Sequence, residues 1–415
     1  MTDAYSAFVY ISLFISLFFE VFLLITYFEV KDEIQAEDLM LAKGPKNFPS
    51  VTVVVPCFNE EQTVIATVKS ILRLRYPRAK LKLILVDDGS KDGTWKALQK
   101  FKDHPQVKLV RKDNGGKHTA VNLALEQTDT DLVGCLDADS FVTEEALRKI
   151  VPYFDDPKVM AVTPSIKIHE PRGVLQRIQK TEYSWSIFLR RMLSSLSALY
   201  VTPGPFSIFR TSVFRELGGY KKAHLTEDME MAMRMQKNHY KIVNSHGAYV
   251  YTVAPKKLKA LVKQRVRWTY GFLNNAIDYR EIFFKPKYGH FGMFIMPLAT
   301  ISSVISLAMV SRLAKESLEG LWRHIGRLEV TGFNTTFHLP TFDWYFLNTS
   351  ALSLVVSTAL LLTLVILYFS LRMADGRFQV SRSLVYYIFI YPFLTPIWLT
   401  QSLWKTIFRR QISWR

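Results

Sequence analysis

The sequence predicts a membrane-anchored α/β protein in which a mostly parallel sheet carries helices on both faces. Two observations predict this class. Short β-branched runs alternate with helical patterns through the middle of the 415-residue chain, and such alternation is typical of a parallel sheet. Long apolar runs lie near both ends of the chain, so interfacial and transmembrane helices are expected beside the sheet.

Four apolar runs could serve as membrane segments, namely residues 7–28, 291–310, 346–371 and 384–404. Each is close to the roughly twenty residues that a spanning helix needs. No basic segment precedes the first run and no small-residue cleavage site follows it, so we expect a retained anchor rather than a cleaved signal peptide. Pro392 and Pro396 interrupt the fourth run, which leaves open a re-entrant or interfacial segment.

The formal net charge of +17 suits either nucleic acid or a membrane surface with anionic substrates. The apolar runs favour the membrane, and we expect no nucleic-acid partner. Lys31, Lys43 and Lys46 follow the first run, so the positive-inside rule predicts a cytoplasmic central region and a multi-pass plasma-membrane protein. Cys57 and Cys135 lack metal-ligand or disulfide spacing and are expected to be buried free thiols.

The side of the membrane that holds the carboxyl-terminal tail stays open. Residues 372–382 are basic and are expected in the cytoplasm, whereas residues 312–345 have balanced charges and are expected outside. If all four runs cross, the basic tail after residue 404 would lie outside, against the positive-inside rule. A fourth segment that does not cross would remove this conflict.

The central region alternates four predicted strands with three predicted helices. The strands are residues 51–55, 81–86, 107–110 and 132–136, and the helices are residues 62–74, 94–101 and 119–126. Ligands of parallel sheets bind beyond the carboxyl ends of the strands. Polar groups follow all four predicted strands and form the candidate site: Asn59 and Glu60, Asp87 and Asp88, residues 112–117, and residues 137–139.

Asp137 and Asp139 follow the fourth predicted strand. Strand alternation puts two residues at this spacing on the same side. Two neighbouring carboxylates repel unless a cation compensates them, and Mg²⁺ binds one or two carboxylates together with substrate phosphate oxygens. An acidic pair at a strand end is often only solvated, but its position after this strand favours a cation site.

Two further strand ends carry groups that suit a nucleotide. Asp87 and Asp88 begin a turn that could simply cap a helix, or one carboxylate could accept hydrogen bonds from a base or ribose. Gly115 and Gly116 precede Lys117 at the start of a predicted helix. Glycines allow close approach of a ligand, and a helix amino terminus with a lysine attracts phosphate, although a plain loop is an equal alternative.

Thr226, Glu227 and Asp228 precede a helical pattern over residues 229–237. Thr226 could be the N-cap, and acids in the first turn are favoured by the helix dipole. That explanation is complete without any function. The alternative is that Asp228 takes a proton from an acceptor hydroxyl as a general base.

Gln264, Arg267 and Trp268 belong to a basic amphipathic helix that begins near residue 258. A membrane-surface helix accounts for its lysines. It accounts less well for Trp268, whose indole suits a stacked sugar ring beside a guanidinium that binds phosphate. Residues 176–201 predict either a second interfacial helix or a helix packed on the sheet.

Six segments in this order resemble the family 2 glycosyltransferases with the GT-A fold, over residues 51–271. They are VVVPCFNE, VDDGSKDGT, NGGKHTAVN, CLDADS, HLTEDMEM and QRVRW. The last is similar to the QxxRW signature of processive members, which make cellulose, chitin, hyaluronan and poly-N-acetylglucosamine. The apolar runs look most like those of bacterial poly-N-acetylglucosamine synthases.

The resemblance implies an anchor over residues 1–30, a cytoplasmic GT-A domain over 47–257, an interfacial helix over 258–290 and a transmembrane region over 291–415. It implies an inverting transfer from a UDP-sugar donor, with UDP-N-acetylglucosamine expected, to a growing polysaccharide. For the donor, the resemblance implies that Asp88 contacts the uridine, Lys117 contacts the diphosphate, and Asp139 with Asp137 binds Mg²⁺ or Mn²⁺. It implies general base catalysis by Asp228 beside Glu227. Acceptor and phosphate binding is implied for Gln264, Arg267 and Trp268.

Other functions stay open at this point. The chain could load one sugar onto a membrane lipid, make hyaluronan, cellulose or another glucan, or keep the fold as a non-catalytic membrane scaffold or nucleotide sensor. The apolar region is short for a polymer channel, so a second membrane subunit or a homodimer could complete an export path.

Overall fold

The computed structural model describes residues 2–331 and 350–408. The chain divides into two compact units. One contains the residues up to Leu24 together with residues 298–367, and the other contains residues 25–297 together with the residues from Tyr368 onward. The second unit contains the sheet.

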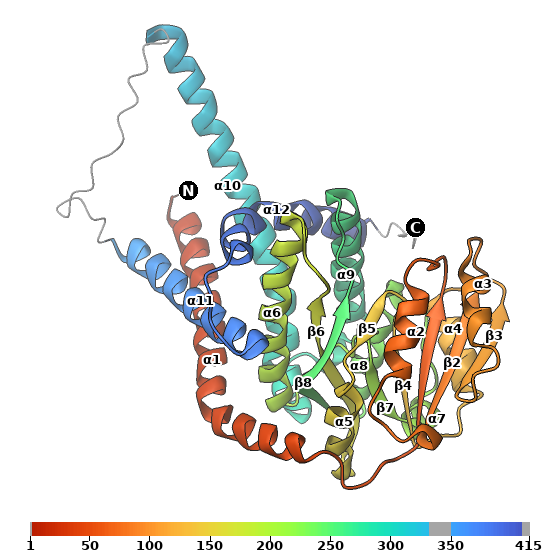
Figure 1. Ribbon diagram of the computed structural model, residues 1–415. Helices are drawn as coiled ribbons and strands as arrows, with labels where there is room; N and C mark the ends of the chain where they lie inside the picture. Colours follow the sequence, from red (N-terminus) through yellow and green to blue (C-terminus); the bar gives the residue numbers. More distant parts are fainter. Residues whose placement is uncertain (1, 332–349, 409–415) are drawn as a thin grey trace. The chain divides into compact units, whose positions relative to one another are not determined.

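An eight-stranded mixed sheet forms the centre of the second unit (Figure 1). Its strand order is β3-β2-β1-β4-β7-β6-β8-β5. The strands are β1 (Val51–Cys57), β2 (Leu81–Asp88), β3 (Val107–Lys112), β4 (Leu132–Cys135), β5 (Ser140–Val142), β6 (Val159–Ile168), β7 (Ser207–Arg210) and β8 (Lys241–Thr252).

The four strands predicted from the sequence form the parallel half of this sheet. β1 pairs in parallel with β2 and β4, and β2 pairs in parallel with β3. Strands β1 to β3 extend two residues beyond their predicted carboxyl ends because ladder pairing continues there, with Cys57 opposite Asp87 and Asp88 opposite Lys112. In the other half, β7 pairs antiparallel with both β4 and β6, and β5 pairs antiparallel with β8. β6 and β8 pair in parallel.

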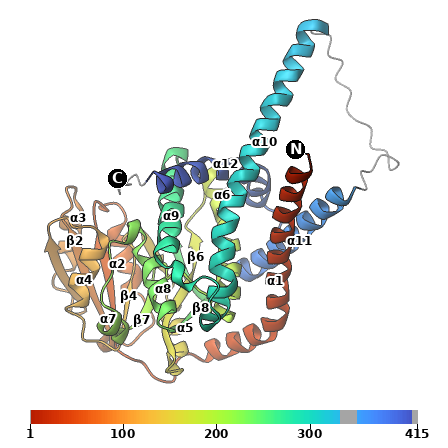
Figure 2. The same ribbon diagram turned by 180° about the vertical axis from the view of Figure 1, so that it is seen from behind.

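Helices cover both faces of the sheet (Figures 1 and 2). Every second residue of β1, from Val51 to Cys57, packs in one hydrophobic core with α2, α3 and α5. α4 contacts β1 and β2 as well, but none of its residues belongs to that core. Since neighbouring side chains of a strand point to opposite faces, α4 lies on the other side. These helices are α2 (Val64–Leu72), α3 (Thr94–Leu98), α4 (Lys117–Leu125) and α5 (Ala146–Ile150).

The remaining helices of this unit position the candidate site. They are α6 (Val174–Ser195), α7 (Thr211–Leu217), α8 (Glu227–Lys237), α9 (Leu258–Asp278) and α12 (Arg382–Ile407). α12 packs against both α6 and α9 and lies across their ends in Figures 1 and 2. α12 continues as one helix through Pro392 and Pro396, and whether it crosses the membrane or lies in the interface stays a prediction.

Four helical segments of the described chain are long and apolar enough to cross a membrane: residues 7–43, 291–309, 351–375 and 382–407. They belong to α1 (Thr2–Lys43), α10 (Met296–Thr331) with the short turn before it, α11 (Ala351–Asp375) and α12. α1 runs beyond the predicted anchor end at residue 30. Residues 312–331 continue α10, and residues 332–349 lie outside the described part.

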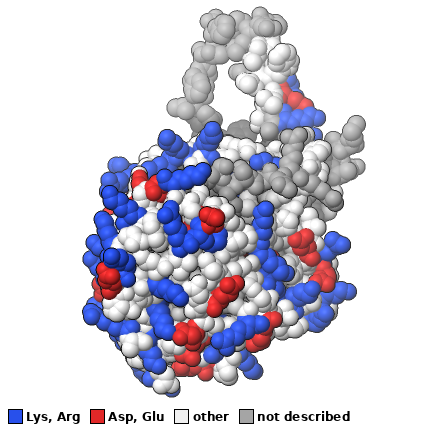
Figure 3. Space-filling model, turned by 90° about the vertical axis from the view of Figure 1, so that its right-hand side faces the viewer, with Lys and Arg blue, Asp and Glu red and all other residues white. Residues whose placement is uncertain are grey.

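The two cysteines and the surface charge agree with the sequence. Cys57 and Cys135 are buried free thiols, as predicted. Lys and Arg side chains spread over the face shown in Figure 3, and Asp and Glu side chains lie among them. The positive charge on this face is therefore interspersed with acidic groups.

Candidate active site

The parallel half of the sheet brings the predicted polar segments to one edge. β3, β2, β1 and β4 are neighbours, and each runs in the same direction as the next. Their carboxyl ends therefore meet at one edge. β2 ends at Asp88, and residues 113–117, Glu60 and residues 137–139 follow β3, β1 and β4. The structure thus brings together four segments that the sequence places up to about eighty residues apart.

Asp88 holds the loop that leads into α4. Its carboxylate accepts hydrogen bonds from the backbone N–H groups of Gly115 at 3.0 Å and Gly116 at 2.9 Å, and from Lys112 Nζ at 2.7 Å. Gly116 has a φ of 91°, a conformation that costs a side-chain-bearing residue energy. Both carboxylate oxygens already have protein partners, so the carboxylate fixes the position from which Lys117 begins the helix. A uridine contact by Asp88 stays a prediction.

Lys117 forms an ion pair with Asp137. Its Nζ lies 2.5 Å from Asp137 Oδ1 and 3.6 Å from Glu227 Oε1. Burial alone would lower the pKa of Lys117, but Asp137 and then Glu227 outweigh it and hold the pKa well above its usual value. This ammonium group links the end of β4, the start of α4 and the start of α8.

No ion pair is made to Asp139 by the residues that the structure describes. The Ser140 hydroxyl donates a hydrogen bond to its Oδ1 at 3.1 Å. Burial, the neighbouring charge of Asp137 and that of Glu60 raise the pKa of Asp139 to about 7. A carboxylate in this setting fits a divalent cation, which would relieve the repulsion.

Side chains alone make an incomplete cation site. Within the described residues, no group of three or more His, Cys, Asp or Glu side chains is arranged to hold a metal ion. Mg²⁺ accepts one or two carboxylates when phosphate oxygens and water supply the other ligands. Asp137 and Asp139 therefore fit a cation that arrives with a phosphate-bearing ligand.

The loop before β7 closes over the Lys117–Asp137 pair. A Cβ atom built on Gly204 would lie 3.0 Å from Asp137 Oδ2 and would collide with Lys117 Nζ. Only glycine leaves room for the ion pair at this point. The sequence points to the loop, since residues 202–206 lie between two predicted elements, but it does not reveal this close approach.

Asp228 lies in the first turn of α8, where the adjoining loop fixes its backbone. The Thr202 hydroxyl donates a hydrogen bond to the Asp228 carbonyl oxygen at 2.8 Å. Burial and the adjacent Glu227 carboxylate raise the pKa of Asp228, while Lys117 and Arg267 oppose this shift. A carboxylate with a raised pKa is a better proton acceptor, which suits a general base.

Thr226 is the N-cap of α8, but its side chain does not cap the helix. Its hydroxyl accepts a hydrogen bond from Asn275 Nδ2 at 2.9 Å and so ties α8 to α9. The predicted N-cap position is therefore confirmed, and the hydroxyl of this residue contacts α9 rather than the backbone N–H groups of α8.

The QRVRW segment lies on α9 beside α8. Arg267 Nη1 donates to the Leu225 carbonyl oxygen at 3.0 Å, two residues before Glu227. Gln264 Oε1 accepts a weaker hydrogen bond from Arg265 at 3.3 Å. The Arg265 guanidinium lies 4.3 Å from the centre of the Trp268 ring and covers one face of the indole. Ligand binding by Gln264, Arg267 and Trp268 stays a prediction.

Arg265 and Glu182 form a buried pair that the sequence analysis did not identify. Arg265 Nη2 lies 2.7 Å from Glu182 Oε2, and Glu182 Oε1 accepts a hydrogen bond from the Tyr391 hydroxyl at 3.0 Å. The pair links α6, α9 and α12. No local pattern reveals it, since its members are far apart in the chain.

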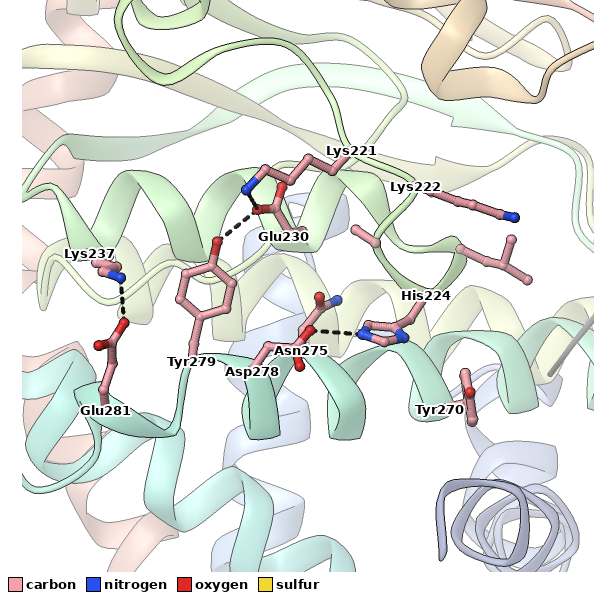
Figure 4. Close-up of a pocket in the computed structure, with 12 residues that line it drawn as sticks. Lys221, Lys222, His224, Glu230, Lys237, Tyr270, Asn275, Asp278, Tyr279 and Glu281 are labelled. Carbon is pink, nitrogen blue, oxygen red and sulfur yellow. Dashed lines mark hydrogen bonds and ion pairs between the residues drawn. The ribbon is translucent and has the colours of Figure 1, made fainter. Parts of the chain in front are cut away.

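A cavity of about 640 Å³ lies between the segment before α8, α8 itself and α9 (Figure 4). Its acidic groups have partners. Glu230 pairs with Arg234 at 2.6 Å, and Asp278 contacts His224 at 2.8 Å. Neither aspartate of the acidic pair nor Asp228 lines this cavity, so it is separate from the strand-end site.

We expect Asp139→Asn to stabilise the cation-free protein at pH 8. The folded pKa of about 7 lies above the usual 3.8, so the folded state favours the protonated carboxyl and loses stability as the pH rises from about 4 to about 7. Asparagine carries no ionisable proton, so the variant does not lose stability at this position as the pH rises. The melting temperature in detergent with a chelator should rise by a few degrees at pH 8, and the gain should vanish near pH 4. A gain that does not change with pH would contradict this account, and Asp129→Asn in an exposed pair is the control.

We expect Gly204→Ala to separate Lys117 from Asp137 and to lower donor affinity at least tenfold, because the added methyl group occupies the ion pair's space. Isothermal titration with UDP and Mn²⁺ would measure the affinity. Gly173→Ala is the matched control, since a Cβ there meets nothing within 4 Å. Equal affinities for the two variants would refute the role of the Gly204 contact.

Comparisons with known proteins agree with this architecture. A family model described as "Glycosyltransferase like family 2" matches residues 49–271. The chain is 30% identical over 263 residues to a poly-beta-1,6-N-acetyl-D-glucosamine synthase of Staphylococcus aureus, covering 63% of each chain. It is 28% identical over 283 residues to the synthase of the same name from Staphylococcus epidermidis, covering 68% of each. The match thus spans a little under two thirds of the length of the first relative.

A solved structure shares the fold. A mannosyltransferase from Pyrobaculum calidifontis, in complex with GDP-mannose and Mn²⁺, superposes with a TM-score of 0.59 at 19% identity, over 94% of this chain and 98% of that one. The predicted mostly parallel α/β fold of the GT-A type is confirmed, and so is the resemblance carried by the six segments. The chain belongs to glycosyltransferase family 2.

Proposed function

We propose that this chain is an inverting glycosyltransferase that moves N-acetylglucosamine from UDP-N-acetylglucosamine onto a growing β-linked polysaccharide. The observation that carries the proposal is the convergence of Asp137, Lys117, Glu227 and Asp228 in one charged cluster at the strand ends. The choice of sugar rests on the names of the staphylococcal relatives.

The reaction is a single displacement at the anomeric carbon of the donor. The Asp228 carboxylate takes the proton of an acceptor hydroxyl, and the hydroxyl oxygen forms a bond to that carbon. The bond between the carbon and the phosphate oxygen breaks on the opposite side, and UDP leaves with its electron pair. This geometry inverts the configuration, so an α-linked donor gives a β-linked product. Lys117 and Arg267 supply positive charge for the departing diphosphate.

Asp139, with Asp137 beside it, would hold Mg²⁺ or Mn²⁺, which would neutralise charge on the diphosphate when bound. The Mn²⁺ in the Pyrobaculum mannosyltransferase supports this assignment. In the cation-free protein the Lys117 ammonium takes the neighbouring position at Asp137. Lys117 would therefore exchange Asp137 for a phosphate oxygen as donor and cation enter together.

The apolar helices support a membrane setting in which the catalytic domain faces the cytoplasm of a plasma-membrane protein. QRVRW and the helices α6, α9 and α12 around it support repeated addition to one polymer. A second membrane subunit or a homodimer would complete an export path.

The test supplies purified protein in nanodiscs with Mg²⁺ and radiolabelled UDP-N-acetylglucosamine, UDP-glucose, UDP-glucuronate or GDP-mannose in parallel. We expect UDP release and a high-mass product with UDP-N-acetylglucosamine alone. A lipid-extractable product with one sugar would contradict polymer synthesis, and turnover only with another donor would contradict the sugar.

We expect Asp228→Asn to lower transfer by about 10²–10⁴, because an amide cannot accept the proton. Titration calorimetry should show unchanged UDP binding. Asp129→Asn, which alters an exposed ion pair with Lys82, should keep full activity. Full activity of the Asp228 variant would show that another group is the base.

A further inference from the structure

Arg190 is a partly buried cation without a hydrogen-bond or ion-pair partner among the residues that the structure describes. It lies near the carboxyl end of α6, and its chain neighbour Arg191 forms an ion pair with Glu37 at 2.5 Å. Successive residues of a helix point about 100° apart, so the two arginines face different surroundings. In the described part of the chain, no hydrogen bond or ion pair is made to the Arg190 guanidinium.

The three arginines that are buried in the described part of the chain each have a carboxylate partner. They are Arg191 with Glu37 at 2.5 Å, Arg234 with Glu230 at 2.6 Å and Arg265 with Glu182 at 2.7 Å. Withdrawing a guanidinium from water without a partner is unfavourable, and burial lowers the pKa of Arg190. A cation kept in this state is suited to a ligand that supplies the missing acceptors.

The groups around Arg190 show which side of the site it faces. The charges that act on it belong to Tyr183, Asp228 and Tyr200. Neither member of the acidic pair at the end of β4 is among them. Lys117, in contrast, interacts with Asp137 and Glu227 as well as with Asp228. The segment that follows α6 is hydrogen-bonded to α8, from the Thr202 hydroxyl to the Asp228 carbonyl oxygen at 2.8 Å and from Gln236 Nε2 to the Leu199 carbonyl oxygen at 2.9 Å. The carboxyl end of α6, which carries Arg190, therefore approaches the start of α8.

Polar and aromatic side chains continue from Arg190 towards α12. Tyr183 lies close enough to Arg265 for the guanidinium charge to act on it, and Arg265 also lies against the Trp268 ring. The ring of Tyr200 packs at a tilt against that of Phe272 on α9, and no hydrogen bond joins its hydroxyl to the described residues. Saccharides bind to surfaces of this kind, because hydroxyl oxygens accept from guanidinium groups and sugar rings pack on aromatic faces.

We propose that Arg190 is an acceptor-binding residue: its guanidinium donates hydrogen bonds to hydroxyl oxygens of the terminal acceptor sugar and so places the attacking hydroxyl at Asp228. The inference rests on the proposed function, since it requires an acceptor hydroxyl at that carboxylate. It adds a residue from α6 to a site otherwise built from strand ends, α8 and α9.

The test compares wild-type protein with Arg190→Gln and Arg190→Lys in nanodiscs. The probe acceptor is a short β-1,6-linked N-acetylglucosamine oligosaccharide, and UDP release is measured with and without it. For Arg190→Gln we expect the acceptor KM to rise by roughly 10- to 100-fold, as for loss of hydrogen bonds from a charged donor. The donor KM and the acceptor-independent hydrolysis of the donor should stay within about twofold of wild type. Arg190→Lys should recover part of the loss.

A control variant, the melting temperature and a binding measurement together separate an effect on binding from an effect on folding. Arg177→Gln alters another arginine of α6, and it should leave every constant unchanged. Arg190→Gln should keep or raise the melting temperature, since no protein partner is lost. Equilibrium binding of the same oligosaccharide, followed by tryptophan fluorescence, should weaken in parallel with the acceptor KM.

The outcomes are distinguishable. Transfer by the wild type with an unchanged acceptor KM in Arg190→Gln would overturn the inference and leave the proposed function standing. A raised donor KM would assign Arg190 to the donor side and also overturn it. A melting temperature lowered equally in Arg190→Gln and Arg190→Lys would show that Arg190 has a structural role, which would also overturn the inference. No acceptor-dependent UDP release by the wild type would refute the proposed function itself, and with it the inference.

Discussion

The ion pair between Lys117 and Asp137 is the contact on which the arrangement of the site depends. It joins the start of α4 to the end of β4, and its second contact with Glu227 reaches α8. Asp88 fixes the loop before Lys117, and Gly204 leaves the space that the pair needs. Three elements that meet only in the folded chain are thus held by one ammonium group, at the position where a nucleotide-sugar transferase needs exchangeable positive charge.

The charges around Asp228 act on its pKa in opposite directions. Burial and Glu227 raise the pKa of this carboxylate, and Lys117 and Arg267 lower it. In the proposed reaction, the site would therefore combine a base with cations that stabilise the leaving diphosphate. A site with only carboxylates would repel the donor, and a site with only cations would weaken the base.

The parallel half of the fold could be predicted because each strand is a local β-branched run followed by polar groups. That pattern alone predicted that Asp137, Asp139 and Lys117 lie at this edge of the sheet. The six ordered segments identified the family. The antiparallel half could not be predicted in this way, since β7 joins β4 to β6 through pairing that leaves little local pattern. The ion pair of Glu182 and the surroundings of Arg190 depend on how α6, α9 and α12 pack, and the space around Gly204 depends on a loop. The continuity of α12 through its two prolines could not be predicted either, because it depends on the packing of this helix against α6 and α9.

The position of Arg265 over Trp268 makes the indole a one-sided platform. If a sugar ring stacks on Trp268, it can use only the uncovered face of the indole. The guanidinium would then lie behind the aromatic ring, on the side away from the sugar. A saccharide could therefore approach this part of α9 from one side only.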